Sequence, residues 1–229
     1  MKSILIVGGS SGIGKASVEL LSKNNKVWAT YNSHPIESTE NSSFHQLNVL
    51  DETIDVSFLP EQIDGIVYCP GAINLKPFAR IKAADFLADY ELQVLGAIKI
   101  IQAVLPKMKN SASASIVLFS TVAVQAGFNF HSIVSASKGA IEGLTRALSA
   151  ELAPKIRVNC IAPSITDTAL AAGLLNTAEK IEANAQRHPL KKIGKAEDIA
   201  NAVAFLISEQ SAWMTGQVVK IDGGMSVIK

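Results

Sequence analysis

The stretch ILIVGGSSGIGKASVELL, residues 4–21, places glycines between an apolar run and an amphipathic segment. The run predicts a strand and the segment a helix. Glycines let the turn tighten and bring backbone close to a ligand, while the free amides and positive end of a helix attract a phosphate. We therefore expect a bound pyrophosphate; the alternative is a tight turn without a ligand. The residues expected to bind it are Gly8, Ser10, Ser11, Gly12, Ile13 and Gly14.

Short apolar, β-branched runs alternate with helical patterns along the whole chain. Strands of continuous apolar character joined by crossover helices are typical of a parallel sheet covered on both faces. We predict an α/β fold, with residues 1–229 forming a single domain around a doubly wound, Rossmann-like parallel sheet. The runs predicted as strands are residues 3–7, 26–31, 44–49, 65–69, 114–120, 156–162 and 216–222.

The helical patterns are long in the second half of the chain and missing from two early crossovers. Residues 83–109 predict a long helix that Pro106 disturbs near its end, because proline has no amide hydrogen. Residues 135–152 predict another helix, whose apolar face serves either core packing or a helix-to-helix dimer contact. Residues 32–43 and 50–64 hold no amphipathic pattern, so loops or single turns are expected there.

Composition and charge exclude several classes of partner. The net charge is +1 and no stripe of Lys and Arg occurs, so neither nucleic acid nor a membrane surface is expected, while a small neutral-to-anionic ligand is compatible. Cys69 and Cys160 lie in apolar segments, which indicates buried thiols and a cytoplasmic protein. The apolar run near Met1 is too short to predict a signal peptide or a membrane span. No metal site is predicted.

The end of the second predicted strand bears on which dinucleotide is bound. An acidic side chain there would hold the ribose 2′-hydroxyl of NAD and repel the 2′-phosphate of NADP. The segment ATYNSHP, residues 29–35, has no acid, and Tyr31, Asn32 and Ser33 leave room and hydrogen bonds for a phosphate. It also lacks an arginine to clamp that phosphate. We predict NADP, with NAD as the alternative; these residues otherwise only form the turn before Pro35.

Three segments share the spacing of one protein family. They are the glycines of residues 4–21, RVNCIAPSITDT at residues 157–168, and HPLKKIGKAEDIANAVAFLISEQSAWMTGQVVKIDGG at residues 188–224. On these motifs the chain resembles the short-chain dehydrogenase/reductase family over nearly its whole length. Ser164 stands in place of a family glycine, and Thr168 stands at the threonine that meets the nicotinamide end.

The active-site motif of the family is only partly present. In the family a tyrosine precedes a lysine by four residues, a serine lies thirteen residues before the tyrosine, and an asparagine supports a proton-relay water. This sequence keeps Lys138 but has Val134, Thr121 and Gln93 at those three positions. Asn48 replaces an aspartate near the adenine, and the turn under the cofactor ends at Gly71. The resemblance thus places Tyr31, Asn32, Asn48, Gly71, Lys138 and Thr168 at the cofactor.

The lysine has two roles in such a site, and only one survives here. Its charge lowers the pKa of the tyrosine, and its ammonium group bonds the nicotinamide ribose. With Val134 in place of the tyrosine, we expect Lys138 to bind the cofactor more than to assist proton transfer. The alternative is a lysine that extends to solvent. Thr121 either orients a substrate carbonyl or bonds local backbone. His131 is a candidate substitute acid, although a solvated or core-edge histidine is the simpler interpretation.

These residues predict an NADP(H)-dependent oxidoreductase of this type, acting on a small carbonyl or alcohol with atypical or impaired proton transfer. Loss of a positioned acid costs about 10²- to 10⁴-fold in rate, so catalysis is weakened without being abolished. The catalytic residues are expected to be Lys138, Thr121 and Gln93. The alternative is a catalytically inactive dinucleotide-binding protein that acts as a sensor, scaffold or oligomer partner. A homodimer or homotetramer is expected in either case.

The segment of residues 169–187 bears on the substrate. It is expected either to cover the site as a helical lid or to form an ordinary surface helix. Its apolar residues Leu170, Leu174 and Leu175 favour a partly hydrophobic ligand.

Overall fold

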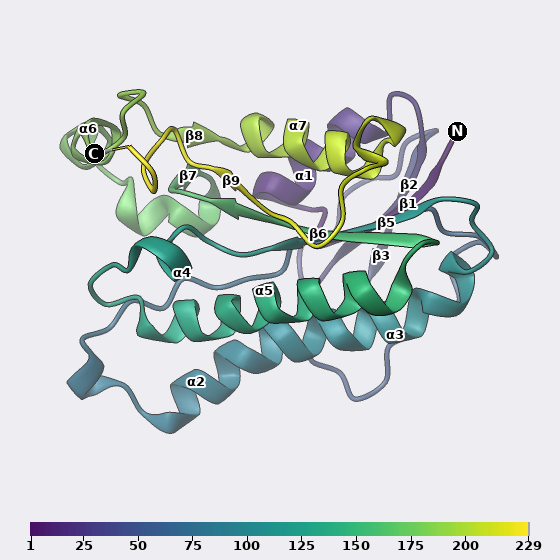
Figure 1. The fold of residues 1–229 in the computed structure, drawn as a ribbon, viewed down its shortest axis with the longest axis horizontal. Coiled ribbons are helices and arrows are strands. Elements are labelled where there is room, and N and C mark those ends of the chain that lie inside the picture. The colour runs from purple at the N-terminus through teal and green to yellow at the C-terminus, as the bar shows by residue number, and fades with distance from the viewer. Residues whose placement is uncertain (229) are drawn as a thin grey trace.

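The computed structural model describes residues 1–228 and shows a central sheet between two layers of helices (Figure 1). Seven strands pair in parallel in the order β3-β2-β1-β4-β5-β6-β9, which confirms the predicted doubly wound α/β fold. A separate pair of short strands, β7 (Thr166–Asp167) and β8 (Gly194–Lys195), was missed by the sequence pattern. The central strands are β1 (Ser3–Val7), β2 (Lys26–Tyr31), β3 (Ser42–Gln46), β4 (Gly65–Tyr68), β5 (Ala114–Phe119), β6 (Ile156–Pro163) and β9 (Val218–Ile221).

The apolar strands are explained by burial on both faces of the sheet. Along β1, Ile4 and Ile6 pack in one core cluster, while Leu5 and Val7 pack in the other, as the alternation of a strand requires. Helices α1 (Gly12–Leu21) and α7 (Ala196–Ile207) cover the first face, and α3 (Gly96–Met108) and α5 (Ser132–Leu152) cover the second (Figure 1). The remaining helical segments are η1 (Phe78–Arg80), α2 (Ala83–Tyr90), η2 (Glu91–Leu95), α4 (Ala123–Ala126), η3 (Ala169–Leu174), α6 (Ala178–Gln186) and η4 (Glu209–Ser211).

The helix predicted over residues 83–109 is irregular at a different place from the one expected. The helical residues run through Pro106 and end two residues later at Met108. The irregularity is instead the π-helix η2 between α2 and α3. There the Tyr68 hydroxyl donates to the Leu92 carbonyl at 2.6 Å, which satisfies a backbone oxygen at the bulge. A Cβ at Gly96 would overlap that hydroxyl, so a glycine is needed for the contact.

The remaining scaffold predictions agree with the structure in part. The two crossovers that lacked an amphipathic pattern hold no helix. Helix α5 begins at Ser132, three residues earlier than predicted, and its leucines Leu144, Leu148 and Leu152 pack against the core, which favours core packing for that face. Cys69 is half-buried, Cys160 is buried, and both are free thiols. No helix within residues 1–228 is long and apolar enough to cross a membrane.

Candidate active site

The strand order reverses between β1 and β4, and ligands of open α/β sheets bind beyond the carboxyl ends of the strands at such a point. A cleft of about 360 Å³ opens there, lined by residues that follow β1, β2 and β4; we call it the cofactor cleft. Of the residues predicted to hold a dinucleotide, those that line it are Gly8, Ser10, Ser11, Gly12, Ile13, Gly14, Tyr31, Asn32, Asn48, Gly71 and Thr168. The fold therefore brings together groups that are distant in the sequence.

The glycines of the loop meet separate requirements. Gly8 and Gly12 have φ values of 75° and 49°, in the left-handed region that favours glycine. A Cβ at Gly14 would overlap the Gly8 carbonyl, so helix α1 can approach the end of β1 only with glycine there. A Cβ at Gly12 would lie 3.3 Å from the Thr168 side chain, which lines the same cleft. The loop is thus shaped by close backbone approach.

The N-terminus of α1 is open to an anion. Ser11 occupies the N-cap position, but its side chain makes no capping hydrogen bond, and the first turn holds no acidic residue. The amides of this turn are therefore available to a phosphate, with the positive end of the helix behind them. Among residues 1–228, no aspartate or glutamate lines the cofactor cleft. These features fit an anionic dinucleotide.

Two residues of this cleft were missed by the sequence reasoning. The Thr30 hydroxyl accepts a hydrogen bond from the Gly8 amide at 3.1 Å and so ties the glycine loop to the end of β2. His34 also lines the cleft, beside Tyr31 and Asn32, and its Nδ1 lies 3.0 Å from the Ser33 hydroxyl. A search for polar residues at the end of the second strand and just after it would have found both, because strand ends are where parallel sheets bind ligands.

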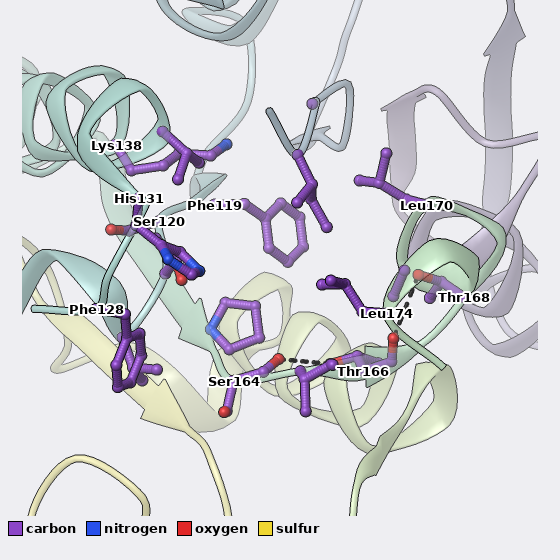
Figure 2. A pocket seen from close by; sticks show the side chains of 18 of the residues that line it. Phe119, Ser120, Phe128, His131, Lys138, Ser164, Thr166, Thr168, Leu170 and Leu174 are labelled. Carbon is purple, nitrogen blue, oxygen red and sulfur yellow. Dashed lines mark hydrogen bonds between the residues drawn. The ribbon is translucent and has the colours of Figure 1, made fainter. Parts of the chain in front are cut away.

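A second cavity, of about 300 Å³, joins the cofactor cleft through shared residues that include Gly71 and Thr168. We call it the substrate cavity. In Figure 2, Lys138 and His131 lie on one side of it and Thr168, Leu170 and Leu174 on the other. The wall is mostly apolar. Of the residues tied to catalysis by the sequence, those that line this cavity are Gln93, Thr121, His131, Val134 and Lys138.

Lys138 is buried in the wall of the substrate cavity, with 8% of its surface exposed. The alternative interpretation, a lysine that extends to solvent, is therefore contradicted. Burial lowers the pKa of its ammonium group to about 8, although the nearby Cys160, Asp89 and Cys69 oppose this. A Cβ at Gly71 would lie 3.8 Å from Lys138 Nζ, so the ammonium group reaches the floor shared by the cavity and the cleft.

Gln93 brings a second polar atom to the same spot. Its amide nitrogen donates to Asp89 Oδ2 at 2.7 Å, which leaves Oε1 buried without a partner among residues 1–228. A Cβ at Gly71 would lie 3.4 Å from that oxygen. Buried polar atoms rarely remain unpaired, so a water or a ligand hydroxyl is expected beside Gly71. The π-helix positions this side chain, and no sequence pattern indicated that bulge.

The remaining wall supplies few proton donors. Val134 is 6% exposed, and its isopropyl group cannot carry a proton. The Thr121 hydroxyl oxygen accepts a hydrogen bond from the Ala123 amide at 3.3 Å, so local backbone engages it as an acceptor only. His131 Nδ1 lies 2.8 Å from the Asn129 carbonyl and must donate to it, which leaves Nε2 for a ligand. His131 itself lies in the wall of the substrate cavity, immediately before α5.

Similarity to known proteins identifies the family. A family model described as Enoyl-(Acyl carrier protein) reductase matches residues 8–226. The chain belongs to the short-chain dehydrogenase/reductase family. It is 31% identical to a tropinone reductase homolog of Arabidopsis thaliana, over 99% of this chain and 92% of that protein. It is 30% identical to the 3-oxoacyl-(acyl-carrier-protein) reductase FabG of Thermotoga maritima, over 99% of this chain and 98% of FabG.

Solved structures of short-chain dehydrogenase/reductase proteins agree with the fold. A short chain dehydrogenase family protein from Francisella tularensis superposes with a TM-score of 0.87 at 28% identity, covering 100% of both chains. ElxO, solved with NADP bound, superposes with a TM-score of 0.84 at 27% identity, covering 98% of this chain and 99% of its own. The chain is therefore an oxidoreductase of short-chain dehydrogenase/reductase type.

In this short-chain dehydrogenase/reductase, the segment expected as a lid forms η3 and then α6. Leu170 and Leu174 line the substrate cavity, whereas Leu175 is buried and does not. The Arg187 guanidinium lies 5.4 Å from the centre of the Phe128 ring, and both line the cavity. No acidic residue within residues 1–228 lines this cavity. Its charged groups are thus all of positive sign.

The two cysteines near the site are not reactive nucleophiles. Burial raises the pKa of the Cys69 thiol to about 12 and that of the Cys160 thiol to about 12. Both thiols are therefore neutral near pH 7, and a thiol is a far weaker nucleophile than a thiolate. Within residues 1–228 no group of three or more His, Cys, Asp or Glu side chains could hold a metal ion.

Proposed function

We propose that this chain is an NADP(H)-dependent oxidoreductase acting on a small carbonyl or alcohol, with atypical or impaired proton transfer. The observation that carries the proposal is the neighbourhood of Lys138 and Val134. One helical turn apart on α5, both face the substrate cavity, the first with a buried ammonium group and the second with an aliphatic group. Lys138 is thus a candidate to hold a ribose, and no tyrosine among residues 1–228 lines the cavity to move a proton.

The protein groups have distinct tasks in this proposal. The amides at the start of α1 hold the pyrophosphate, Thr168 meets the nicotinamide end, and Lys138 donates to the nicotinamide ribose. The dinucleotide supplies the hydride when it is bound. Thr121 donates its hydroxyl hydrogen to the substrate oxygen, and Gln93 Oε1 holds the water expected beside Gly71. Positioning of this kind can contribute more to the rate than the missing acid would.

NADP is favoured over NAD by the end of the cofactor cleft that follows β2. Within the described part of the chain no acid lines the cleft there, and Tyr31, Asn32, Ser33 and His34 offer hydrogen-bond donors to a phosphate. The structural relative ElxO has been solved with NADP bound. Among residues 1–228, no arginine or lysine lines the cleft to clamp the phosphate, so a modest preference for NADP is proposed.

The substrate proposed for the cavity is apolar with a neutral or anionic end. Leu170, Leu174 and Phe119 provide an apolar surface, and Arg187 at the lid offers its charge to a carboxylate. The relatives include a 3-oxoacyl-(acyl-carrier-protein) reductase, which is compatible with such a ligand.

A second function, dinucleotide binding without turnover, is favoured by Val134 itself. The test is to titrate NADPH and NADH separately and then to follow nucleotide oxidation with a panel of carbonyl compounds. Turnover that is lost in His131→Ala or Thr121→Ala would identify the substitute acid or the orienting hydroxyl. Tight NADPH binding with no turnover across the panel would support the binding protein, and absence of nucleotide binding would contradict both functions.

A further inference from the structure

Two polar side chains in the wall of the substrate cavity are bonded to each other and have no part in the proposed hydride chemistry. Ser164 follows β6 and His188 follows α6. Ser164 Oγ and His188 Nε2 lie 2.8 Å apart, and both residues line the cavity. The serine is half-buried, whereas the histidine is only 3% exposed. A reachable hydroxyl therefore faces a sheltered imidazole.

The direction of this hydrogen bond follows from the other ring nitrogen. His188 Nδ1 lies 2.7 Å from the Asn184 carbonyl oxygen. Because a carbonyl oxygen only accepts, Nδ1 carries the hydrogen, and Nε2 of the neutral ring carries the lone pair. The Ser164 hydroxyl therefore donates to Nε2. A serine whose hydrogen is held by an imidazole that a third group orients has the geometry of an activated nucleophile.

The surrounding chain fixes both members of the pair. The Ser164 amide donates to the Ile221 carbonyl at 3.2 Å, and the Ser164 carbonyl accepts from Thr166 Oγ1 at 3.0 Å (Figure 2). The imidazole packs against Gly223, where an added Cβ would lie 3.5 Å from His188 Cδ2. Nucleophile and base are thus in place before a ligand arrives, which is what catalysis by such a pair requires.

We infer that Ser164 and His188 form a nucleophile–base pair for acyl transfer from esters or thioesters to water, an activity separate from the proposed redox function. Ser164 Oγ bonds to the acyl carbon as its proton passes to His188 Nε2. The bond from that carbon to the leaving oxygen or sulfur breaks, and the leaving group takes the proton. Water then cleaves the acyl-serine: one proton passes through His188 back to Ser164, and the acid is released. Ester and water give acid and alcohol.

The cavity wall indicates the acyl group. Phe119, Ile165 and Leu174 line the same space as the serine, so an apolar acyl chain of a few carbons is the substrate class. A hydrogen bond that only braced the end of β6 against the end of α6 would have the same length. Covalent reactivity of the Ser164 hydroxyl distinguishes a nucleophile from a purely structural hydrogen bond.

The test follows p-nitrophenolate release from p-nitrophenyl butyrate by the full chain, with no nucleotide present, so that a failure of the redox proposal does not affect it. A positioned base contributes about 10²- to 10⁴-fold, so Ser164→Ala and His188→Gln should each lose at least about 100-fold. Ser120→Ala is the matched control, since Ser120 lines the same cavity but donates to Glu142 at 2.7 Å. It should keep the rate.

A fluorophosphonate probe provides a second measurement. One adduct per chain is expected, located at Ser164 by peptide mass spectrometry and absent from His188→Gln. If a variant does not fold, Ser164→Gly serves in its place, because glycine removes the hydroxyl without adding volume. The inference is overturned if folded Ser164→Gly hydrolyses the ester as fast as the unmodified chain, if the adduct forms on another residue, or if the unmodified chain neither hydrolyses nor labels.

Discussion

The cofactor cleft and the substrate cavity share a floor at Gly71 but differ in how completely their chemistry is supplied. The cleft has glycines that its backbone requires, helix amides without a side-chain cap and, among residues 1–228, no acid. The cavity has one buried ammonium group, an unpaired amide oxygen and an aliphatic side chain at Val134. Under the proposed function, holding a dinucleotide and moving a proton depend on different residues, so the scaffold could lose one ability and keep the other. Substitutions on each side test that separation.

The largest effect is expected at the cleft, from Gly14→Ala. The new Cβ would overlap the Gly8 carbonyl, which is backbone and cannot move aside cheaply. Overpacking costs about 1–3 kcal/mol or more, and the shift of α1 would displace the amides that we propose to bind phosphate. Nucleotide binding measured by calorimetry should be lost, with a lower thermal midpoint.

Gly143→Ala is the matched control for this change. Gly143 is exposed on α5, and an added Cβ would meet nothing within 4 Å. Alanine should stabilise that helix by about 1 kcal/mol and leave nucleotide binding unchanged. Equal binding by Gly14→Ala and Gly143→Ala would mean that the glycine loop does not shape the cleft.

The next effect is expected at the cavity, from Val134→Tyr. If only the phenol is missing, the new hydroxyl would enter a site where Lys138 already supplies a positive charge to lower its pKa. Carbonyl reduction should rise about 10²- to 10⁴-fold, the contribution of a positioned acid. Steady-state rates with NADPH measure the gain.

Val134→Phe separates the hydroxyl from the ring. It adds the same bulk without a proton and should not raise the rate. An equal gain in both variants would mean that the ring only reshapes the pocket. No gain with tyrosine would mean that more than the phenol is missing, including the water position at Gln93.

The sequence could predict the cleft well because each of its requirements is local. A glycine next to a strand end must serve close backbone approach wherever the strand lies, and alternating apolar runs predict a two-sided sheet. The π-helix at Glu91–Leu95 could not be predicted in this way. It depends on the Tyr68 hydroxyl, which comes from a strand more than twenty residues earlier and meets Leu92 only in the folded chain.

The cavity was harder to predict for the same reason. Spacing along α5 places Val134 and Lys138 on one face, but it does not say whether the lysine points to solvent or inward. Burial of Lys138 depends on the elements that carry Gly71 and Gln93. The pair of Ser164 and His188 joins segments 24 residues apart and left no pattern in the sequence.

Lys138→Met should weaken NADPH binding by about 10- to 100-fold, since a hydrogen bond from a charged donor is worth about 1.5–3 kcal/mol. It should also stabilise the free protein. The folded pKa of about 8 lies below the ordinary 10.5, so the buried charge costs stability below pH 8, and the cost fades as pH rises towards 10.5.

The gain in unfolding free energy from Lys138→Met should reach up to about 3 kcal/mol at pH 7 and shrink between pH 8 and 10.5. Urea unfolding across that pH range measures it, and Lys191→Met, which alters an exposed lysine, is the control. A destabilised Lys138→Met chain with unchanged NADPH affinity would give the lysine a structural role and remove it from the cofactor site.

The smallest effect is expected from Asn32→Asp, at the end of the cleft where NADP and NAD differ. A carboxylate there would accept a hydrogen bond from the 2′-hydroxyl of NAD and repel the 2′-phosphate of NADP. The repulsion between two charges a few ångströms apart near a solvated surface amounts to about 1 kcal/mol or more. The NADPH-to-NADH affinity ratio should fall about tenfold. Asn201→Asp makes the same change on the exposed face of α7 and should leave the ratio unaltered. An unaltered ratio in Asn32→Asp would place the adenosine phosphate away from the end of β2 and remove the basis for preferring NADP. The proposed pyrophosphate contacts at α1 would stand, since they depend on Gly14 and not on Asn32.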